Sequence, residues 1–340
     1  DPVGLDLTPS DQGYVMSWCE CWKGIESREE AGKLYLQQQK FDLAIEQLEQ
    51  AVGEDSTSGE AYYHLGRANG LAGYYVEMVV AFDRSLALSG QFETQIKEER
   101  LYYWTRLYND GVRIASMRQP HLEQARTKFR LATKIIPSRL LAWKNLGITQ
   151  YSLGEIDEAI TTFEHVTLFS RNDTVSLRTL GTLYLQQRRD QDAIEVFERA
   201  LLQVEQLGTL TNLAVAHTRL GHLDEAEKTY LRALETNQDH WQSHYNLGSL
   251  YWQRGRLNDA REAFERAVEL NPDDIDARHN LAAAYLGLNL LDEAFPLLEM
   301  LVQDMPHNAS LWRELARVYD HRGMVEEGRM AYDRATEFGE

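Results

Sequence analysis

Cysteine is almost absent from this chain of 340 residues, which contains only Cys19 and Cys21. Two cysteines cannot form the disulfide framework of a small secreted domain. Because they are two positions apart, they point in different directions in a helix, so we expect no bond between them. Cys19 falls on an apolar stripe and is predicted to be a buried hydrophobe, whereas Cys21 is a surface thiol or a link to another chain in this interpretation.

Basic residues are scarce relative to acidic ones. The chain has 35 Lys and Arg against 53 Asp and Glu, which gives a formal net charge of -18. Nucleic acid attracts cationic surfaces, so we expect no nucleic-acid partner. No apolar run approaches the ~18 residues that a membrane helix needs, so the sequence predicts no membrane span.

The motifs that usually carry catalysis are missing. The sequence contains no glycine-rich phosphate loop, no HExxH, no nucleophile elbow and no Cys-x-x-Cys. His240 and His244 have the spacing of two metal ligands on one helix, but no third ligand is evident, so groove or surface histidines are the better interpretation. We therefore expect no catalytic residue, no metal and no cofactor.

What the sequence does contain is a repeat. Pro272 and Pro306 lie 34 residues apart, and leucine, tyrosine and alanine positions share that offset along most of the chain. Within each repeat, small and aromatic residues recur at helical spacing, as in Ala260, Phe264 and Ala267. Each repeat therefore predicts two amphipathic helices.

Turn and cap residues recur at the junction between the two helices. Left-handed glycines are predicted to end the first helix; they are Gly154, Gly221 and Gly255. Asp or Asn is predicted to cap the second helix; these residues are Asp42, Asp157, Asp224, Asn258 and Asp292.

This pattern resembles the tetratricopeptide repeat, with its leucine–glycine, tyrosine, alanine, phenylalanine and proline positions. The resemblance implies an all-α fold, a right-handed α-α superhelix or solenoid of about nine helix-turn-helix units. It divides the chain into an N-terminal segment with a capping helix (1–24), units 1 and 2 (25–92), an irregular unit 3 with a long helix (93–139) and units 4 to 9 (140–340).

The resemblance also implies where a ligand binds, because in this family the first helix of each unit lines the concave surface. The sixth position of the unit is asparagine in several units; these residues are Asn145, Asn212, Asn246 and Asn280. Such a ladder is similar to that of the repeat region of O-GlcNAc transferases, and a carboxamide can hydrogen-bond a peptide backbone without reading its sequence. Alternatively, asparagine suits this position because it bonds a neighbouring helix.

Neighbouring groove positions would supply specificity. Lys144 and Arg178 could hold a carboxylate, or could pair with nearby acids of the chain itself. Tyr245 and Trp252 share a helix face and could cradle an apolar side chain. Tyr151 and His279 complete the expected peptide-binding set.

A basic run interrupts the acidic chain. Between 106 and 144, Lys and Arg greatly outnumber the two acids, Asp110 and Glu123. Arg126, Arg130 and Lys134 follow i, i+4 spacing and form one stripe, which would either dock an acidic partner or remain a solvated face.

These observations favour a non-catalytic scaffold that binds a protein or an extended peptide in its groove. One alternative is a self-assembling oligomer, because no solvating helix follows the last unit and its C-terminal face could pack on a second copy. Another is the substrate-recruiting arm of a larger enzyme. The compartment stays open between cytoplasm and periplasm or export, because the chain starts at Asp1 rather than Met.

Overall fold

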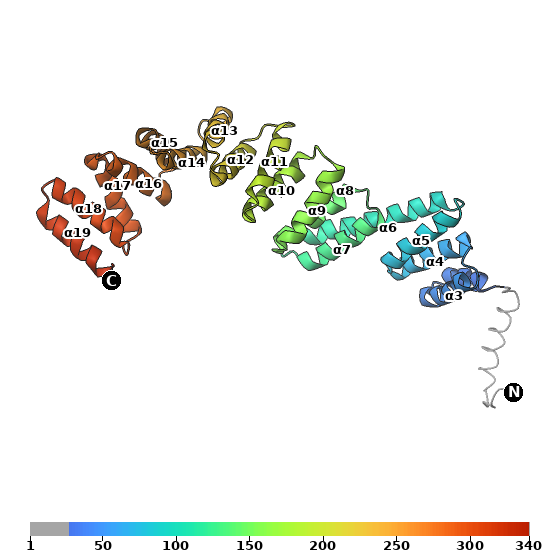
Figure 1. The fold of residues 1–340 in the computed structure, drawn as a ribbon. Helices are drawn as coiled ribbons and strands as arrows, with labels where there is room; N and C mark the ends of the chain where they lie inside the picture. Colours follow the sequence, from blue (N-terminus) through green and yellow to red (C-terminus); the bar gives the residue numbers. More distant parts are fainter. Residues whose placement is uncertain (1–26, 340) are drawn as a thin grey trace, which may run out of the picture. The chain divides into compact units, whose positions relative to one another are not determined.

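The computed structural model describes residues 27–339, and these residues form helices and turns without a strand (Figure 1). The fold is all-α, as predicted. The N-terminal segment, with the predicted capping helix (1–24), Cys19 and Cys21, lies outside the described residues.

The helices alternate between the first and second members of successive pairs. The first helices are α2 (Arg28–Gln37), α4 (Gly59–Ala72), α6 (Glu93–Ala115), α8 (Leu140–Ser152), α10 (Thr174–Gln186), α12 (Leu207–Leu220), α14 (Trp241–Gln253), α16 (Ile275–Gly287) and α18 (Ala309–His321). The second helices are α3 (Phe41–Glu54), α5 (Tyr75–Leu88), α7 (Leu122–Ile135), α9 (Ile156–Phe169), α11 (Asp190–Leu201), α13 (Leu223–Thr236), α15 (Leu257–Leu270), α17 (Leu291–Asp304) and α19 (Val325–Glu337). The described part of the chain is therefore a solenoid of nine helix pairs.

The chain divides into two compact units, and the division falls within α9. The N-terminal unit covers 1–162 and the C-terminal unit covers 163–340. Apart from α5, the second helix of one pair packs on the first helix of the next within each unit, as α3 does on α4 and α11 does on α12. The hydrophobic core consequently runs along each unit as a series of linked clusters.

Several pairs close through a glycine that faces an aromatic ring. A Cβ on Gly181 would lie 2.4 Å from Phe197, and one on Gly248 would lie 2.7 Å from Phe264. Both rings are fully buried. The leucine–glycine of the first helix and the phenylalanine of the second thus form a single contact that brings the two helices close together.

Left-handed residues end the first helices, as predicted for Gly154, Gly221 and Gly255. The predicted N-caps of the second helices are wrong. Those helices begin two residues earlier than predicted, so that Asp224 and Asp292 lie inside the first turn, and the cap residues His222 and Leu290 make no side-chain cap bond. Asp42, Asp157 and Asn258 are displaced in the same way.

The tight turn explains this difference, because the residue after the left-handed one is already the N-cap and the next one starts the helix. The acids then interact with the positive end of the helix dipole instead of capping it. Side-chain caps occur at first helices, where longer connections leave room for them; these caps are Ser27, Ser58, Asp173, Asp274 and Asn308.

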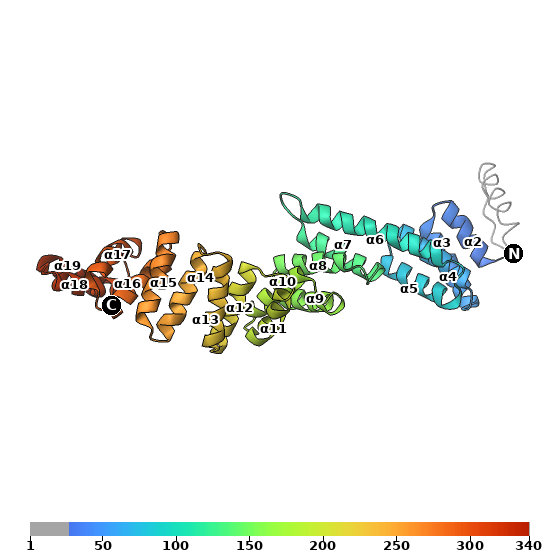
Figure 2. The same ribbon diagram turned by 90° about the horizontal axis from the view of Figure 1, so that it is seen from above.

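The third pair is irregular. α6 is one helix of 23 residues, and Figure 2 shows it running beside α7, which it contacts. Trp104 stacks on Tyr108 with ring centroids 4.8 Å apart, and both belong to or pack on the core of the N-terminal unit. The additional turns of α6 also allow α5 to contact α7, so two second helices meet.

Candidate functional site

A polar cleft crosses three successive first helices of the C-terminal unit. It has a volume of about 490 Å³ and lies against α10, α12 and the start of α14. Its polar lining includes the predicted residues Arg178 and Asn212. Its other polar lining residues include Thr179, Thr182, Gln206, Thr209, Thr211 and Gln242.

Most polar groups of this cleft are already bonded within the protein. The hydroxyls of Thr179, Thr182 and Thr211 donate to carbonyls one helical turn earlier. The Arg178 guanidinium donates to the Gln206 side chain. Asn212 is half-buried and has no hydrogen-bond partner among the described residues, so its carboxamide is free to bind a ligand.

His240 stands at the end of the same cleft. Its Nδ1 lies 2.8 Å from the Ser243 hydroxyl, and burial together with the neighbouring His244 lowers the pKa of its imidazole. His244 Nε2 lies 2.9 Å from the Gln238 carbonyl oxygen. Among residues 27–339, no three His, Cys, Asp or Glu side chains gather as metal ligands would.

The asparagines of the expected ladder fall into two kinds. Asn145 donates to the Tyr108 hydroxyl at 3.1 Å, and Asn280 donates to the Tyr245 hydroxyl at 3.2 Å. Asn212 and Asn246 make no such bond within the described residues. The structure therefore joins Tyr245 and Asn280 of neighbouring first helices, and for Asn145 and Asn280 it matches the alternative that the asparagine bonds a neighbouring helix.

The remaining predicted residues differ in exposure. Tyr245 packs its ring 6.0 Å from that of Phe264 and is half-buried, whereas Trp252 is 42% exposed and lies beside Gly287. Tyr151 is also 42% exposed. Lys144 is half-buried and belongs to the N-terminal unit, while Arg178 belongs to the C-terminal unit.

The sixth position of the first helix, which is asparagine in several pairs, carries a titratable residue in two others: His64 in the second pair and Glu314 in the last described pair. Burial raises the pKa of the Glu314 carboxyl, which the charges of His279 and Arg317 partly offset. Burial and the charge of Lys33 lower the pKa of His64 to about 4. His279 therefore lies beside an acid of the next first helix, in a polar surface that includes the ladder position.

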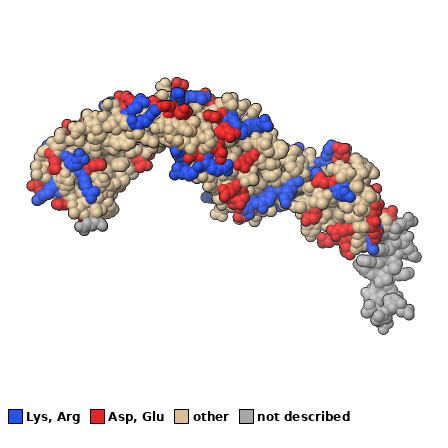
Figure 3. All heavy atoms as spheres, viewed as in Figure 1, with Lys and Arg blue, Asp and Glu red and all other residues tan. Residues whose placement is uncertain are grey.

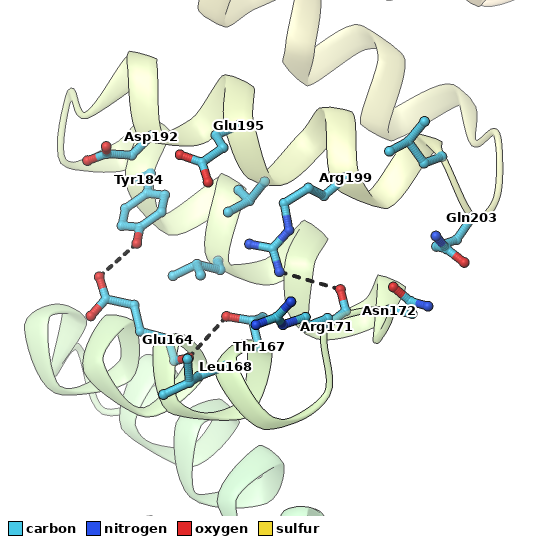
Figure 4. A pocket seen from close by; sticks show the side chains of 13 residues that line it. Glu164, Thr167, Leu168, Arg171, Asn172, Tyr184, Asp192, Glu195, Arg199 and Gln203 are labelled. Carbon is cyan, nitrogen blue, oxygen red and sulfur yellow. Dashed lines mark hydrogen bonds between the residues drawn. The ribbon is translucent and has the colours of Figure 1, made fainter.

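A second cleft, of about 570 Å³, lies between α9, α10 and α11 (Figure 4). Glu164 accepts a hydrogen bond from the Tyr184 hydroxyl at 2.7 Å on one side of it. The same tyrosine–glutamate bond recurs later in the array, again between residues 20 positions apart. Since it recurs, this bond joins neighbouring repeats and does not mark the cleft as a binding site.

The predicted basic stripe on α7 is not uniform. Arg126 forms ion pairs with Glu123 and Glu155, so its charge is neutralised within the N-terminal unit. Arg130 and Lys134 are exposed and have no carboxylate partner among the described residues.

At the other end of the chain, Val325 and Met330 of α19 are exposed, and self-association through this face stays a prediction.

Comparisons with known proteins agree with this architecture. A family model of the tetratricopeptide repeat matches residues 30–77, 211–275 and 245–308, and a second model of the same repeat matches 176–211. No curated protein matches the chain. None of the helices within residues 27–339 is long and apolar enough to span a membrane.

Solved structures of repeat proteins are similar to parts of the chain. A tetratricopeptide repeat protein from Parabacteroides merdae is 16% identical over 70% of this chain and 94% of its own, with a TM-score of 0.53. The pilF protein of Pseudomonas aeruginosa is 16% identical over 61% and 94%, with a TM-score of 0.50. YrrB, described as having an unusual peptide-binding site, is 20% identical over 54% and 94%, with a TM-score of 0.47. The first two support the fold alone.

Proposed function

Because the chain is a tetratricopeptide repeat protein, we propose that it is a scaffold that binds an extended segment of a partner protein along its first helices. The repeat commonly mediates protein–protein contact, and repeat scaffolds of this kind are generally non-catalytic. The partner in this proposal is a protein or peptide, and the chain acts by holding it.

One observation carries the proposal: the polar cleft on α10, α12 and α14 contains an asparagine without a partner among the described residues. Asn212 is half-buried among side chains that mostly bond other groups of the protein, and its carboxamide can offer two N–H donors and one acceptor. A peptide backbone offers the complementary groups at every residue. The cleft therefore suits a segment whose backbone is extended and whose own groups are not paired in a helix.

The other predicted residues take supporting roles in this proposal. Asn246 repeats the chemistry of Asn212 one repeat later. Asn145 and Asn280 are oriented by their tyrosine partners and each keeps a second N–H for a ligand. The side chains proposed to select among peptides are Lys144, Tyr151, Arg178, Tyr245, Trp252 and His279.

Peptides selected from a displayed random library on the wild-type chain test this proposal. We expect Asn212→Ala combined with Asn246→Ala to weaken their binding about tenfold, because each lost hydrogen bond contributes about 0.5–1.5 kcal/mol. Neither side chain bonds another described residue, so the melting temperature should change little. Fluorescence anisotropy and thermal unfolding measure the two effects.

Asn258→Ala is the matched control, since Asn258 is an exposed asparagine on a second helix, α15. It should leave peptide affinity unchanged. If the selected peptides bind the double variant as tightly as the wild-type chain, the asparagines do not hold the ligand. A large drop in melting temperature would instead assign them a structural role.

A further inference from the structure

Beside the irregular third pair, the N-terminal unit has an apolar cleft that lies between two second helices and one first helix. The cleft has a volume of about 570 Å³ and lies between α5, α7 and α8. Its wall on α5 consists of Val76, Val79 and Val80, and Trp143 and Leu146 of α8 lie on its other side. It exists because the long α6 places α5 beside α7, whereas a second helix elsewhere in the array packs mainly on the next first helix.

The apolar wall of this cleft is exposed to an unusual degree. Val80 is 65% exposed and Val76 is 38% exposed, on a helix whose Met78 and Phe82 are fully buried. Further in, the Thr162 hydroxyl donates to the side-chain oxygen of Gln150 at 2.7 Å. A partner side chain that entered here would meet a wall that is mainly aliphatic.

Two cations stand at the rim of the same cleft. Arg130 and Lys134 of α7 line it, are exposed, and have no carboxylate partner within residues 27–339. Figure 3 shows Lys and Arg side chains gathered over α7 on one face of the molecule. Arg126, one turn earlier, is already neutralised by Glu123 and Glu155, so unpaired positive charge remains at the cleft itself.

We propose that this cleft docks an acidic amphipathic segment of a partner protein. A large apolar side chain of that segment inserts between Val80 and Trp143, and its carboxylates pair with Arg130 and Lys134. The charge complementarity selects an acidic partner, and the aliphatic wall requires apolar side chains, which a nucleic acid lacks. This site is separate from the polar cleft on α10, α12 and α14, so the chain can hold two partners through independent surfaces.

Three labelled synthetic peptides test the proposal: one combining Glu with leucines at helical spacing, one with Ser replacing the leucines, and one with Lys replacing Glu. We expect only the Glu–Leu peptide to bind the wild-type chain in fluorescence anisotropy. Its affinity should fall as salt rises, because exposed ion pairs are screened. Arg130→Glu with Lys134→Glu should weaken binding about tenfold, and Val80→Gln with Val76→Gln should weaken it by a similar factor.

Two control variants show whether the peptide binds at this cleft and not elsewhere on the chain. Lys228→Glu reverses an exposed cation on α13 and should leave the affinity unchanged. Asn212→Ala should also leave it unchanged, because that residue belongs to the peptide groove of the proposed function. No binding of the Glu–Leu peptide, equal binding of the Glu–Ser peptide, or equal affinity for the Arg130 and Lys134 variant would each overturn the proposal.

Discussion

At the scale of single residues, equivalent positions of the repeat make different interactions. The sixth position of the first helix carries Asn212, which has no partner in the described chain, and Asn280, which is bonded to Tyr245. In the second repeat the same position carries His64, whose side chain is only 15% exposed and whose Nδ1 is buried without a hydrogen-bond partner among the described residues. The chemistry of this position therefore depends on its surroundings and not on the repeat alone.

His64 makes the stability of the N-terminal unit depend on pH. Burial lowers its pKa from 6.5 to about 4, so the unfolded chain binds its proton before the folded chain does. Between these two values the unfolded state holds more protons, and the free energy of unfolding falls as the pH is lowered. We expect His64→Asn to reduce this fall in thermal unfolding followed by circular dichroism. His321→Asn, at an exposed histidine, is the control; an unchanged pH slope in His64→Asn would contradict the assignment.

At the scale of the elements, the turn between the two helices keeps the same left-handed conformation in most pairs, although the residue that adopts it differs. Glycine takes the left-handed conformation at Gly221 and Gly255, but Gln39, Arg188 and Asn289 take it too, with φ near that of a left-handed helix. A Cβ in this region costs about 1 kcal/mol or more. The packing of the two helices thus stabilises the left-handed turn even where a non-glycine residue pays a conformational cost for it.

Replacing Arg188 by glycine should stabilise the chain. The side chain is exposed and φ is 59°, so Arg188→Gly removes strain, for an expected gain of about 0.5–1 kcal/mol in the free energy of unfolding. Asn289→Gly should give less, because asparagine tolerates this conformation better. Chemical denaturation measures both. Gly255→Ala should have the opposite sign, and a loss of stability in Arg188→Gly would show that its side chain contributes contacts.

At the scale of the whole molecule, stability is local. Within each unit, helix pairs contact their neighbours, and the apolar core consists of clusters along the chain. Damage to one repeat should therefore spread to adjacent repeats and fade with distance. This differs from a globular domain, in which one core links all elements.

Phe82→Ala should show that the loss of stability is confined to the neighbouring repeats. Phe82 is fully buried and packs on Gly66, so its truncation costs about 3–5 kcal/mol. In hydrogen–deuterium exchange, amides of α4 and α5 should lose protection while those of α14 to α19 keep it. Phe264→Ala, the equivalent change in the C-terminal unit, should give the reverse pattern. Equal loss along the chain in either variant would mean that the array unfolds as one cooperative body.

The helix pairs, their period and the left-handed glycines were readable from the amino-acid sequence, because hydrophobic spacing and the demand for positive φ act within a few residues. The features that the sequence left open or did not reveal involve residues far apart along the chain. Asn145 bonds a tyrosine 37 positions away, and Asn280 one 35 positions away. The neutralised Arg126 and the cleft between α5 and α7 likewise appear only after the helices have packed. Local order follows from short-range sterics and burial, whereas the availability of a side chain to a partner is decided by which distant groups the packing brings to it.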